Sequence, residues 1–156
     1  MKKRSFLMLV VLVVMLFVST ACSLNKESID YQEFNNIMTN NGFNVVNVEE
    51  QFQEYEYFEE SYVALDANGN YQIEFYELED ESYAISFYNN NKSIFEEESS
   101  IVTFQSNTNL TNSNKFVLVT DTEYKVISRI DDTVIYLNVD KKYKEEVTNI
   151  LKKLGY

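Results

Sequence analysis

The residues best suited to chemistry in this chain are carboxylates, and they are densest between residues 49 and 60. Two carboxyl groups at a set distance, one with a raised pKa, are sufficient for acid/base hydrolysis of a glycoside. The candidates in this run are Glu49, Glu54, Glu56, Glu59 and Glu60. Because the chain holds 25 acidic residues, two carboxylates come close by chance, and the sequence singles out no catalytic pair.

The same run also has the composition of a binding surface. Tyr55, Tyr57 and Phe58 would stack on a cationic or carbohydrate partner, while Glu54 and Glu56 accept hydrogen bonds from it. The alternative is a solvated loop with one or two rings anchored in the core. We take these five residues as the candidate binding surface.

Histidine is absent from the chain, and there is a single cysteine. This composition excludes an intramolecular disulfide, zinc sites built from Cys and His, and nucleophilic mechanisms that need an imidazole base. We therefore predict a protein without catalytic residues, a cofactor or a metal site.

A calcium-like pattern begins at Asp66, with oxygen side chains at Asn68 and Asn70 and a carboxylate, Glu77, at the terminal ligand position. The glycine required at the sixth position is replaced by Tyr71, and the flanking segments resemble strands rather than helices. A hairpin around the Asn-Gly pair at 68–69 explains the same residues, so calcium remains the weaker interpretation.

Arg129 is the only arginine beyond residue 21, and it lies in a segment with the alternation of a strand. An isolated arginine at such a position is expected to pair with a carboxylate on a neighbouring strand rather than to bind a ligand.

The N-terminus has three parts in a fixed order. Lys2, Lys3 and Arg4 precede thirteen uncharged apolar residues, 6–18, which are followed by small residues and Cys22. The apolar run is shorter than the roughly 20 residues that cross a bilayer core, and its length is typical of an export signal.

Residues 19–22, Ser-Thr-Ala-Cys, resemble the lipobox of bacterial lipoproteins, although Ser19 stands where that family usually has an aliphatic residue. The resemblance implies cleavage between Ala21 and Cys22 and a diacylglyceryl group on the Cys22 thiol, with an uncleaved signal anchor as the alternative. Together with the composition, rich in Asn, Lys, Ile, Tyr and Glu, the chain is similar to small lipoproteins of low-GC Gram-positive bacteria. That similarity implies a place on the outer face of the cytoplasmic membrane and carries no activity with it.

The net charge of the chain limits the classes of partner that it can bind. Without residues 1–21 it keeps 10 basic against 25 acidic side chains, a net charge of −15. Such a chain repels nucleic acid and anionic headgroups, and it favours a cationic peptide, a basic protein surface or a divalent metal. The alternative is that the charge serves solubility alone.

The segments that must position these residues show helix and hairpin signals. Asp30 opens a capping box for a helix that runs to about Asn41, and Gly42 is placed to end it. A short strand and a loop are expected within 45–58, and an Asn-Gly hairpin joins 62–67 to 70–77.

The second half shows similar signals. Asp80 caps a second helix, whose apolar positions include Ala84 and Phe95, and Asp140 caps a final helix. The segments expected between these helices are a strand at 101–105, a surface loop at 106–114, and a three-stranded meander at 116–120, 124–130 and 133–139.

These elements predict an α+β fold with an antiparallel sheet, made of a hairpin plus a three-stranded meander. About three helices are expected to cover one face, in the order helix, hairpin, helix, meander, helix. The predicted organisation is a signal peptide at 1–21, a lipidated tether at 22–28 and a single domain at 29–156.

The functional expectation is a membrane-anchored, non-catalytic binding domain that takes an envelope protein or a cationic ligand. A carboxylate-dependent hydrolase of cell-wall glycan is the alternative.

Overall fold

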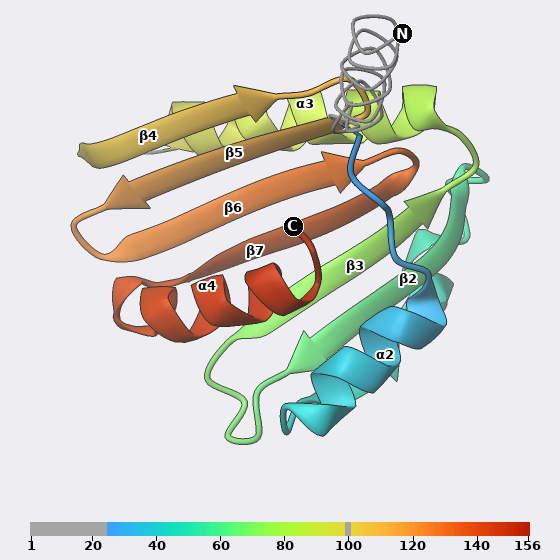
Figure 1. Cartoon of the computed structure of the whole chain (residues 1–156), viewed down its shortest axis with the longest axis horizontal. Helices are drawn as coiled ribbons and strands as arrows, with labels where there is room; N and C mark the ends of the chain where they lie inside the picture. The colour runs from blue at the N-terminus through green and yellow to red at the C-terminus, as the bar shows by residue number, and fades with distance from the viewer. Residues whose placement is uncertain (1–24, 99–100) are drawn as a thin grey trace, which may run out of the picture.

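The computed structural model describes residues 25–98 and 101–156, which form three α-helices and one seven-stranded antiparallel sheet. The predicted α+β class is confirmed, and Figure 1 shows the arrangement. The predicted signal peptide, its cleavage site at Ala21 and the lipidation site at Cys22 lie outside the described residues.

The described part of the chain begins and ends with a helix, and a third helix lies between the two groups of strands. In chain order the described elements are α2 (Tyr31–Asn40), β1 (Asn44–Asn47), the 3-10 helix η1 (Glu49–Phe52), β2 (Phe58–Leu65), β3 (Gln72–Leu78), α3 (Glu81–Glu98), β4 (Val102–Asn109), β5 (Ser113–Thr120), β6 (Glu123–Ile130), β7 (Thr133–Asp140), the 3-10 helix η2 (Lys141–Tyr143) and α4 (Lys144–Lys153).

The sheet consists of two meanders joined at its centre. The strand order is β1-β2-β3-β7-β6-β5-β4, so that β3 pairs with β7, with Phe75 opposite Ile135. The sheet is larger than the predicted hairpin plus three-stranded meander, because β1 and β4 extend it at its two edges.

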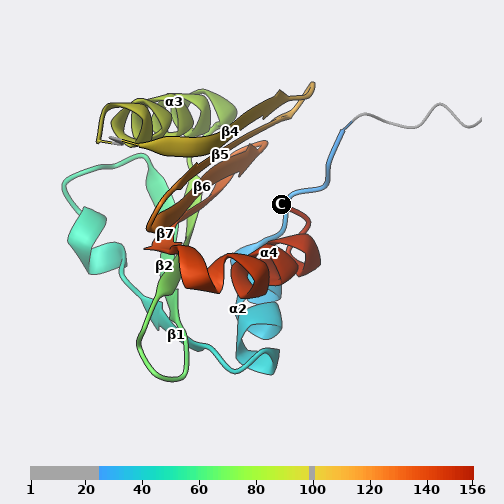
Figure 2. The same ribbon diagram turned by 90° about the vertical axis from the view of Figure 1, so that its left-hand side faces the viewer.

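Helices cover both faces of the sheet, as Figure 2 shows: α2 and α4 lie on one face, here called the α2–α4 face, and α3 lies on the other, the α3 face. The expectation that all helices cover one face is therefore wrong. The reason is visible in consecutive strand residues such as Phe75 and Tyr76, which are both buried although they point to opposite faces. A sheet that is apolar on both faces needs cover on both.

Each face has its own core. On the α2–α4 face, Phe34 of α2 stacks on Phe75 with ring centroids 4.9 Å apart, and Val147 and Leu151 of α4 complete the cluster. The core on the α3 face is built from Tyr76, Leu78, Ala84, Tyr88, Phe95, Phe116, Leu118, Ile127 and Val134. Ala84 and Phe95, the apolar positions predicted for the second helix, both belong to the core on the α3 face.

The helix starts follow the predicted caps. Asp30 Oδ1 accepts a hydrogen bond from the Glu33 amide (2.8 Å), and Asp80 Oδ1 accepts one from the Tyr83 amide (3.0 Å). Asp140 caps the short η2 that leads into α4 rather than α4 itself. Gly42 ends α2 with a φ of +86°, a conformation that favours glycine.

The predicted surface loop at 106–114 is wrong for most of its length. Strand β4 continues to Asn109 and pairs with β5, which begins at Ser113. Most of β4 is exposed, because it is an edge strand of the sheet. Polar residues can occupy such a strand, since little of it enters the core. In the segment 45–58 the expected short strand is β1, and the following η1 was not predicted.

Candidate functional site

The acidic and aromatic run forms a hollow of about 420 Å³ beside the start of β2. Its lining residues come from the end of β1, from η1 and from the loop before β2; they are Asn47, Glu49, Glu50, Phe52, Gln53, Tyr55, Glu56, Phe58 and Glu59. We call this the acidic hollow. In Figure 2 the segment 49–52 lies on the same side of the sheet as α3.

The aromatic residues of the run divide into anchored rings and one exposed ring. Phe58 contacts Phe52 and Phe87, with centroid distances of 4.6 and 5.6 Å, and Tyr57 stacks on Tyr83 at 5.1 Å. Tyr55 is 50% exposed. Of the three predicted contact rings, Tyr57 and Phe58 therefore hold the loop against α3, and Tyr55 is the ring available to a partner.

Four carboxylates line the acidic hollow, those of Glu49, Glu50, Glu56 and Glu59. Over the described ranges, none of the four is within 4.0 Å of a Lys or Arg nitrogen. Asn47 shapes the start of η1, because its Oδ1 accepts from the Glu49 amide (2.8 Å) while its Nδ2 donates to Glu49 Oε1 (2.6 Å). The hollow thus concentrates negative charge beside an aromatic face, an arrangement that suits a cation.

Glu60, next to the hollow, is held differently from the lining residues. Its Oε2 is buried without a hydrogen-bond partner among the described groups. Burial raises the pKa of Glu60, and the nearby Glu49 raises it further, although an interaction with Tyr62 opposes the shift. A raised pKa is the property that a carboxyl group needs in order to act as a general acid.

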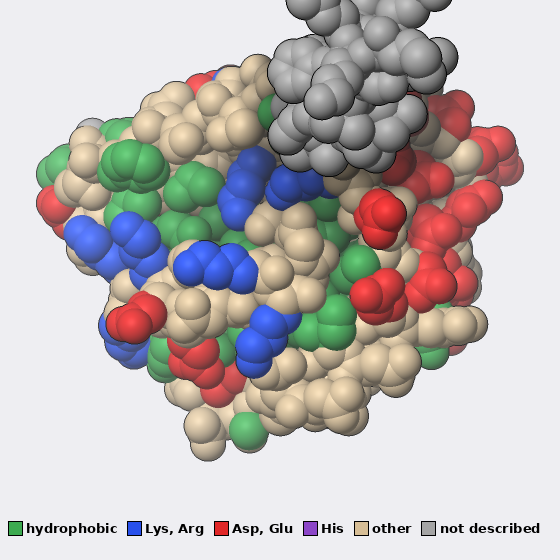
Figure 3. Space-filling model, viewed as in Figure 1, with side chains coloured by type: hydrophobic (Ala, Val, Ile, Leu, Met, Phe, Trp, Pro, Cys, Tyr) green, Lys and Arg blue, Asp and Glu red, His purple; other side chains and the backbone are tan. Residues whose placement is uncertain are grey.

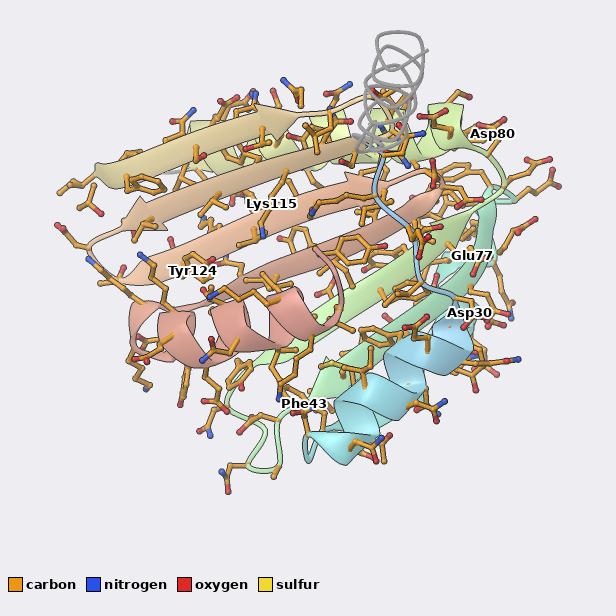
Figure 4. The ribbon with its side chains drawn as sticks, in the orientation of Figure 1. Asp30, Phe43, Glu77, Asp80, Lys115 and Tyr124 are labelled. Atoms are coloured by element: carbon orange, nitrogen blue, oxygen red, sulfur yellow. The ribbon has the colours of Figure 1, made fainter. Side chains whose placement is uncertain are left out.

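Glu77 lies opposite Glu60 on the neighbouring strand, and its pKa is also raised. Burial is the main cause, followed by the charges of Asp132, Glu59, Glu60 and Asp30. Figure 4 shows Glu77 close to Asp30 at the start of α2. In the part of the chain that the structure describes, no group of three or more Asp, Glu, Cys or His residues is arranged to hold a metal ion.

The calcium-like segment is a hairpin turn, as the stronger interpretation predicted. Asp66 Oδ2 accepts from the Asn68 amide (3.2 Å) and the Asn70 side chain (3.1 Å), and Oδ1 accepts from the Tyr71 amide (3.1 Å). The carboxylate is therefore occupied by the turn itself. Glu77 lies near the far end of β3, away from these oxygens.

Arg129 pairs with a carboxylate as expected, but the carboxylate belongs to a helix. Its Nη1 lies 2.8 Å from Glu81 Oε1 at the start of α3, and it also donates to the Asp131 carbonyl (2.7 Å). Nε donates to Asn114 Oδ1 (2.9 Å) on β5. The expected cross-strand carboxylate is wrong, because the α3 face, to which Arg129 points, is covered by the helix that supplies Glu81.

Sequence reasoning missed a second charged surface. Figure 3 shows most acidic side chains of this view on the right, whereas basic side chains lie at the centre and left, over α4 and the adjoining strands, with a few acidic side chains among them. Lys115 on β5 and Lys144 and Lys152 on α4 belong to this group. The signal in the sequence was the eight-residue spacing of Lys144 and Lys152, which places both on one side of a helix.

None of the helices formed by residues 25–98 and 101–156 has the length and apolar character required to cross a membrane. The chain matches no protein-family model, and neither a curated protein nor a solved structure shows significant similarity to it.

Proposed function

We propose that this chain is a lipid-anchored, extracytoplasmic binding protein whose acidic hollow captures a cationic segment of an envelope protein. The anchor is Cys22, acylated after cleavage of residues 1–21, and it holds the domain at the outer face of the cytoplasmic membrane. Support for the anchor comes from the positive, apolar and small-residue segments that precede Cys22.

The observation that carries the binding proposal is the set of four carboxylates around the exposed ring of Tyr55. Glu49, Glu50, Glu56 and Glu59 have no described cation to neutralise them, so lysine or arginine side chains of a partner would meet unpaired charge. Tyr55 adds a face on which a guanidinium or ammonium group can lie.

The strength of such binding follows from the exposure of the hollow. Exposed ion pairs contribute about 0.2–1 kcal/mol each, and an exposed cation–π contact about 0.5–1 kcal/mol. A short cationic peptide is therefore expected to bind in the millimolar range, with strong dependence on salt. Attachment of both partners to the envelope raises their effective concentration and compensates for the weak contact.

The competing function is hydrolysis of a cell-wall glycan by paired carboxylates. The raised pKa of Glu60 beside Glu49 is the feature that favours it. In the binding proposal neither residue acts on a substrate, so Glu60→Gln leaves the digestion of purified cell wall at the background level of the buffer. A hydrolysis that this substitution abolishes without loss of folding would replace the binding proposal by the enzyme.

The direct test is photo-crosslinking on intact cells that carry the lipidated protein, with a photoreactive amino acid in place of Tyr55. The expected result is one envelope protein, joined through a segment rich in Lys or Arg. A matched control carries the photoreactive group at Asn89, an exposed position on α3.

Two further variants decide the outcome. Capture is expected to fall in a quadruple Glu-to-Gln variant of the four lining residues, and also in Cys22→Ser, which lacks the anchor. Capture that persists in the quadruple variant, or that is equal at Asn89, contradicts binding by the acidic hollow.

A further inference from the structure

The cations of the described chain have different surroundings on the two faces of the sheet. On the α3 face, Lys92 pairs with Glu96 (2.7 Å), Lys125 with Glu123 (3.3 Å) and Arg129 with Glu81. On the opposite face, Lys115, Lys144 and Lys152 have no carboxylate oxygen within 4.0 Å among the residues the structure describes, a difference that structural ion pairing does not explain.

These lysines surround a part of the sheet that none of the described helices covers. Phe104 on β4 is 54% exposed, and Lys144 Nζ lies 6.0 Å from its ring centroid. Lys115 of β5 pairs with Thr108, which lies four residues from Phe104 on β4, so Lys115 and Phe104 are on the same side of the sheet. Figure 4 shows Lys115 on the face turned to the viewer, and Lys152 of α4 is close enough for its charge to act on Lys115. We call Lys26, Lys115, Lys144, Lys152 and Phe104 the lysine face.

The charged form of Lys115 is disfavoured by its surroundings, and an anion bound next to it would stabilise that charged form. Burial lowers the pKa of its ammonium group, and the neighbouring charges of Lys26 and Lys152 lower it further. Three acidic residues, Glu27, Glu33 and Glu145, line the hollows next to these lysines and weaken the positive potential, although none of them pairs with Lys26, Lys144 or Lys152.

The N-terminal segment is fixed at this same face. The Lys26 amide donates to Asn112 Oδ1 (3.0 Å), and Asn112 Nδ2 donates back to the Lys26 carbonyl (2.8 Å). Lys26 Nζ donates to the Gly155 carbonyl (3.0 Å), so the side chain is held against the end of α4. The direction in which the chain leaves the domain is thereby determined by three hydrogen bonds.

The distance from this fixed point to the proposed anchor is short. Three residues lie between Lys26 and Cys22, and the four Cα–Cα steps that join them span about 14 Å in a fully extended chain. Lys26, and with it the edge of the lysine face at the end of α4, therefore stays within roughly two Debye lengths of the proposed anchor, since that length is about 8 Å at physiological ionic strength. At such distances nearby charges outweigh the net charge of the chain, whose acidic hollow is on the other side of the sheet.

We propose that the lysine face docks on the anionic headgroups of the membrane and holds the acidic hollow pointing away from the bilayer. This inference rests on the proposed acylation of Cys22. Phe104 enters the headgroup layer beside Lys144, and Lys115 and Lys152 approach lipid phosphates. The domain is then an oriented platform rather than a freely rotating body on a flexible tether.

The test uses the full chain, expressed in a bacterium that processes lipoproteins, purified in detergent and reconstituted into vesicles. Because acylation occupies Cys22, the chain's only cysteine, a new cysteine can carry a fluorophore at one chosen site. One variant, Thr108→Cys, places it opposite Lys115 on β4, and the other, Gln53→Cys, places it at the acidic hollow.

Quenching by aqueous acrylamide reports whether each fluorophore is shielded. On phosphatidylglycerol vesicles the label at position 108 is expected to be quenched at least about twofold less than the label at position 53. On phosphatidylcholine vesicles, and at about 0.5 M salt where screening is strong, the difference is expected to disappear. Equal quenching of both labels on phosphatidylglycerol, or shielding that is the same on both lipids, overturns the proposal.

Matched lysine substitutions sharpen the result. Lys152→Gln is expected to lower the ratio of docked to undocked protein about fivefold, which corresponds to about 1 kcal/mol for one lysine at an anionic surface. Lys92→Gln removes the same charge from the α3 face and is expected to leave the ratio unchanged. Equal effects of both substitutions contradict docking through the lysine face.

Flotation of the vesicles separates this inference from the proposed anchor. Protein that floats on both lipids but shows no difference between the two labels is anchored and not docked. Protein that floats on neither lipid lacks the acyl anchor, and with it the close approach on which docking depends, so this result overturns both proposals.

Discussion

The basic side chains on the two faces of the sheet differ in whether they form ion pairs. On the α3 face, buried or half-buried cations meet carboxylates and tie the helix to the strands, as Arg129 does with Glu81. On the α2–α4 face, Lys115, Lys144 and Lys152 have no carboxylate oxygen within 4.0 Å among the described residues, and on the other face the carboxylates of the acidic hollow have no cation nitrogen within that distance in the same part of the chain. The paired Arg129 ties a helix to the strands, whereas the unpaired lysines Lys115, Lys144 and Lys152 and the unpaired carboxylates of the acidic hollow lie on opposite faces of the sheet, and these are the groups for which we propose partners.

The largest expected effect on stability comes from removing a paired cation. Arg129→Met leaves the Asp131 carbonyl and Asn114 side chain without a donor, and it deprives Glu81 of its partner. Hydrogen bonds to charged groups contribute about 1.5–3 kcal/mol, and Glu81 is half exposed and can be hydrated, so we expect a loss of about 2–3 kcal/mol in the free energy of unfolding. Urea denaturation measures it.

The control for this prediction is an unpaired cation. Lys152→Gln is expected to change the free energy of unfolding by less than about 0.5 kcal/mol, as for most exposed positions. Similar losses for Arg129→Met and Lys152→Gln would remove the distinction between the two faces.

A smaller effect is expected where Asn112 fixes the N-terminal segment. Asn112→Ala removes two hydrogen bonds to the backbone of Lys26, with an expected cost of about 1 kcal/mol for local opening. Hydrogen exchange of the Lys26 amide is then expected to be about fivefold faster. Thr111→Ala, a change in the same turn, serves as the control, and an equal acceleration there would show that the loop rather than the Asn112 side chain holds the segment.

The local signals in the sequence were sufficient for most elements and insufficient for their assembly. Asp30 and Asp80 were identifiable as caps, and the Asn-Gly pair as a turn, because each acts within a few residues. The pairing of β3 with β7 joins residues about 60 positions apart, and no local pattern encodes it. Buried neighbours such as Phe75 and Tyr76 also conceal which face a helix will cover.

The two candidate surfaces could likewise be predicted from the sequence only where their residues are close together in the chain. The acidic run was recognisable in the sequence because its residues are contiguous, but only the fold separates the anchored Tyr57 from the exposed Tyr55. Only the spacing of Lys144 and Lys152 on one helix indicated the lysine face, because Lys26 and Lys115 are distant from them in sequence and the acidic net charge of the chain conceals the basic cluster.

The carboxylate of Glu77, on a strand near the acidic hollow, makes the free energy of unfolding depend on pH. Because burial and neighbouring carboxylates raise the pKa of Glu77 in the folded protein, the folded state binds a proton more readily than the unfolded state. The contribution of Glu77 to stability therefore increases as the pH falls from 7 through the raised pKa toward the ordinary value of 4.5, and this gain is complete below that value.

Glu77→Gln removes this charge at neutral pH. We expect it to raise the free energy of unfolding by up to about 1 kcal/mol at pH 7, since like charges directly opposite on neighbouring strands are destabilising. The variant should also lose part of the stability gain on acidification. Thermal unfolding between pH 5 and 7 measures both, with the exposed Glu97→Gln on α3 as control, and a destabilised Glu77→Gln would show that this carboxylate holds the strands together.

The smallest effect on stability is expected at Tyr55, because an exposed ring that serves recognition contributes little to the fold. Its ring centroid lies 5.8 Å from that of Tyr57 and 6.4 Å from that of Phe58, and half of the residue is exposed, so Tyr55→Ala is expected to cost less than about 0.5 kcal/mol. Tyr57→Ala, which loses the stacked contact with Tyr83, is expected to cost about 1 kcal/mol or more. If Tyr55→Ala keeps the fold but loses partner capture, the exposed ring serves recognition; a large loss of stability would place Tyr55 among the anchors and leave the acidic hollow without its aromatic contact.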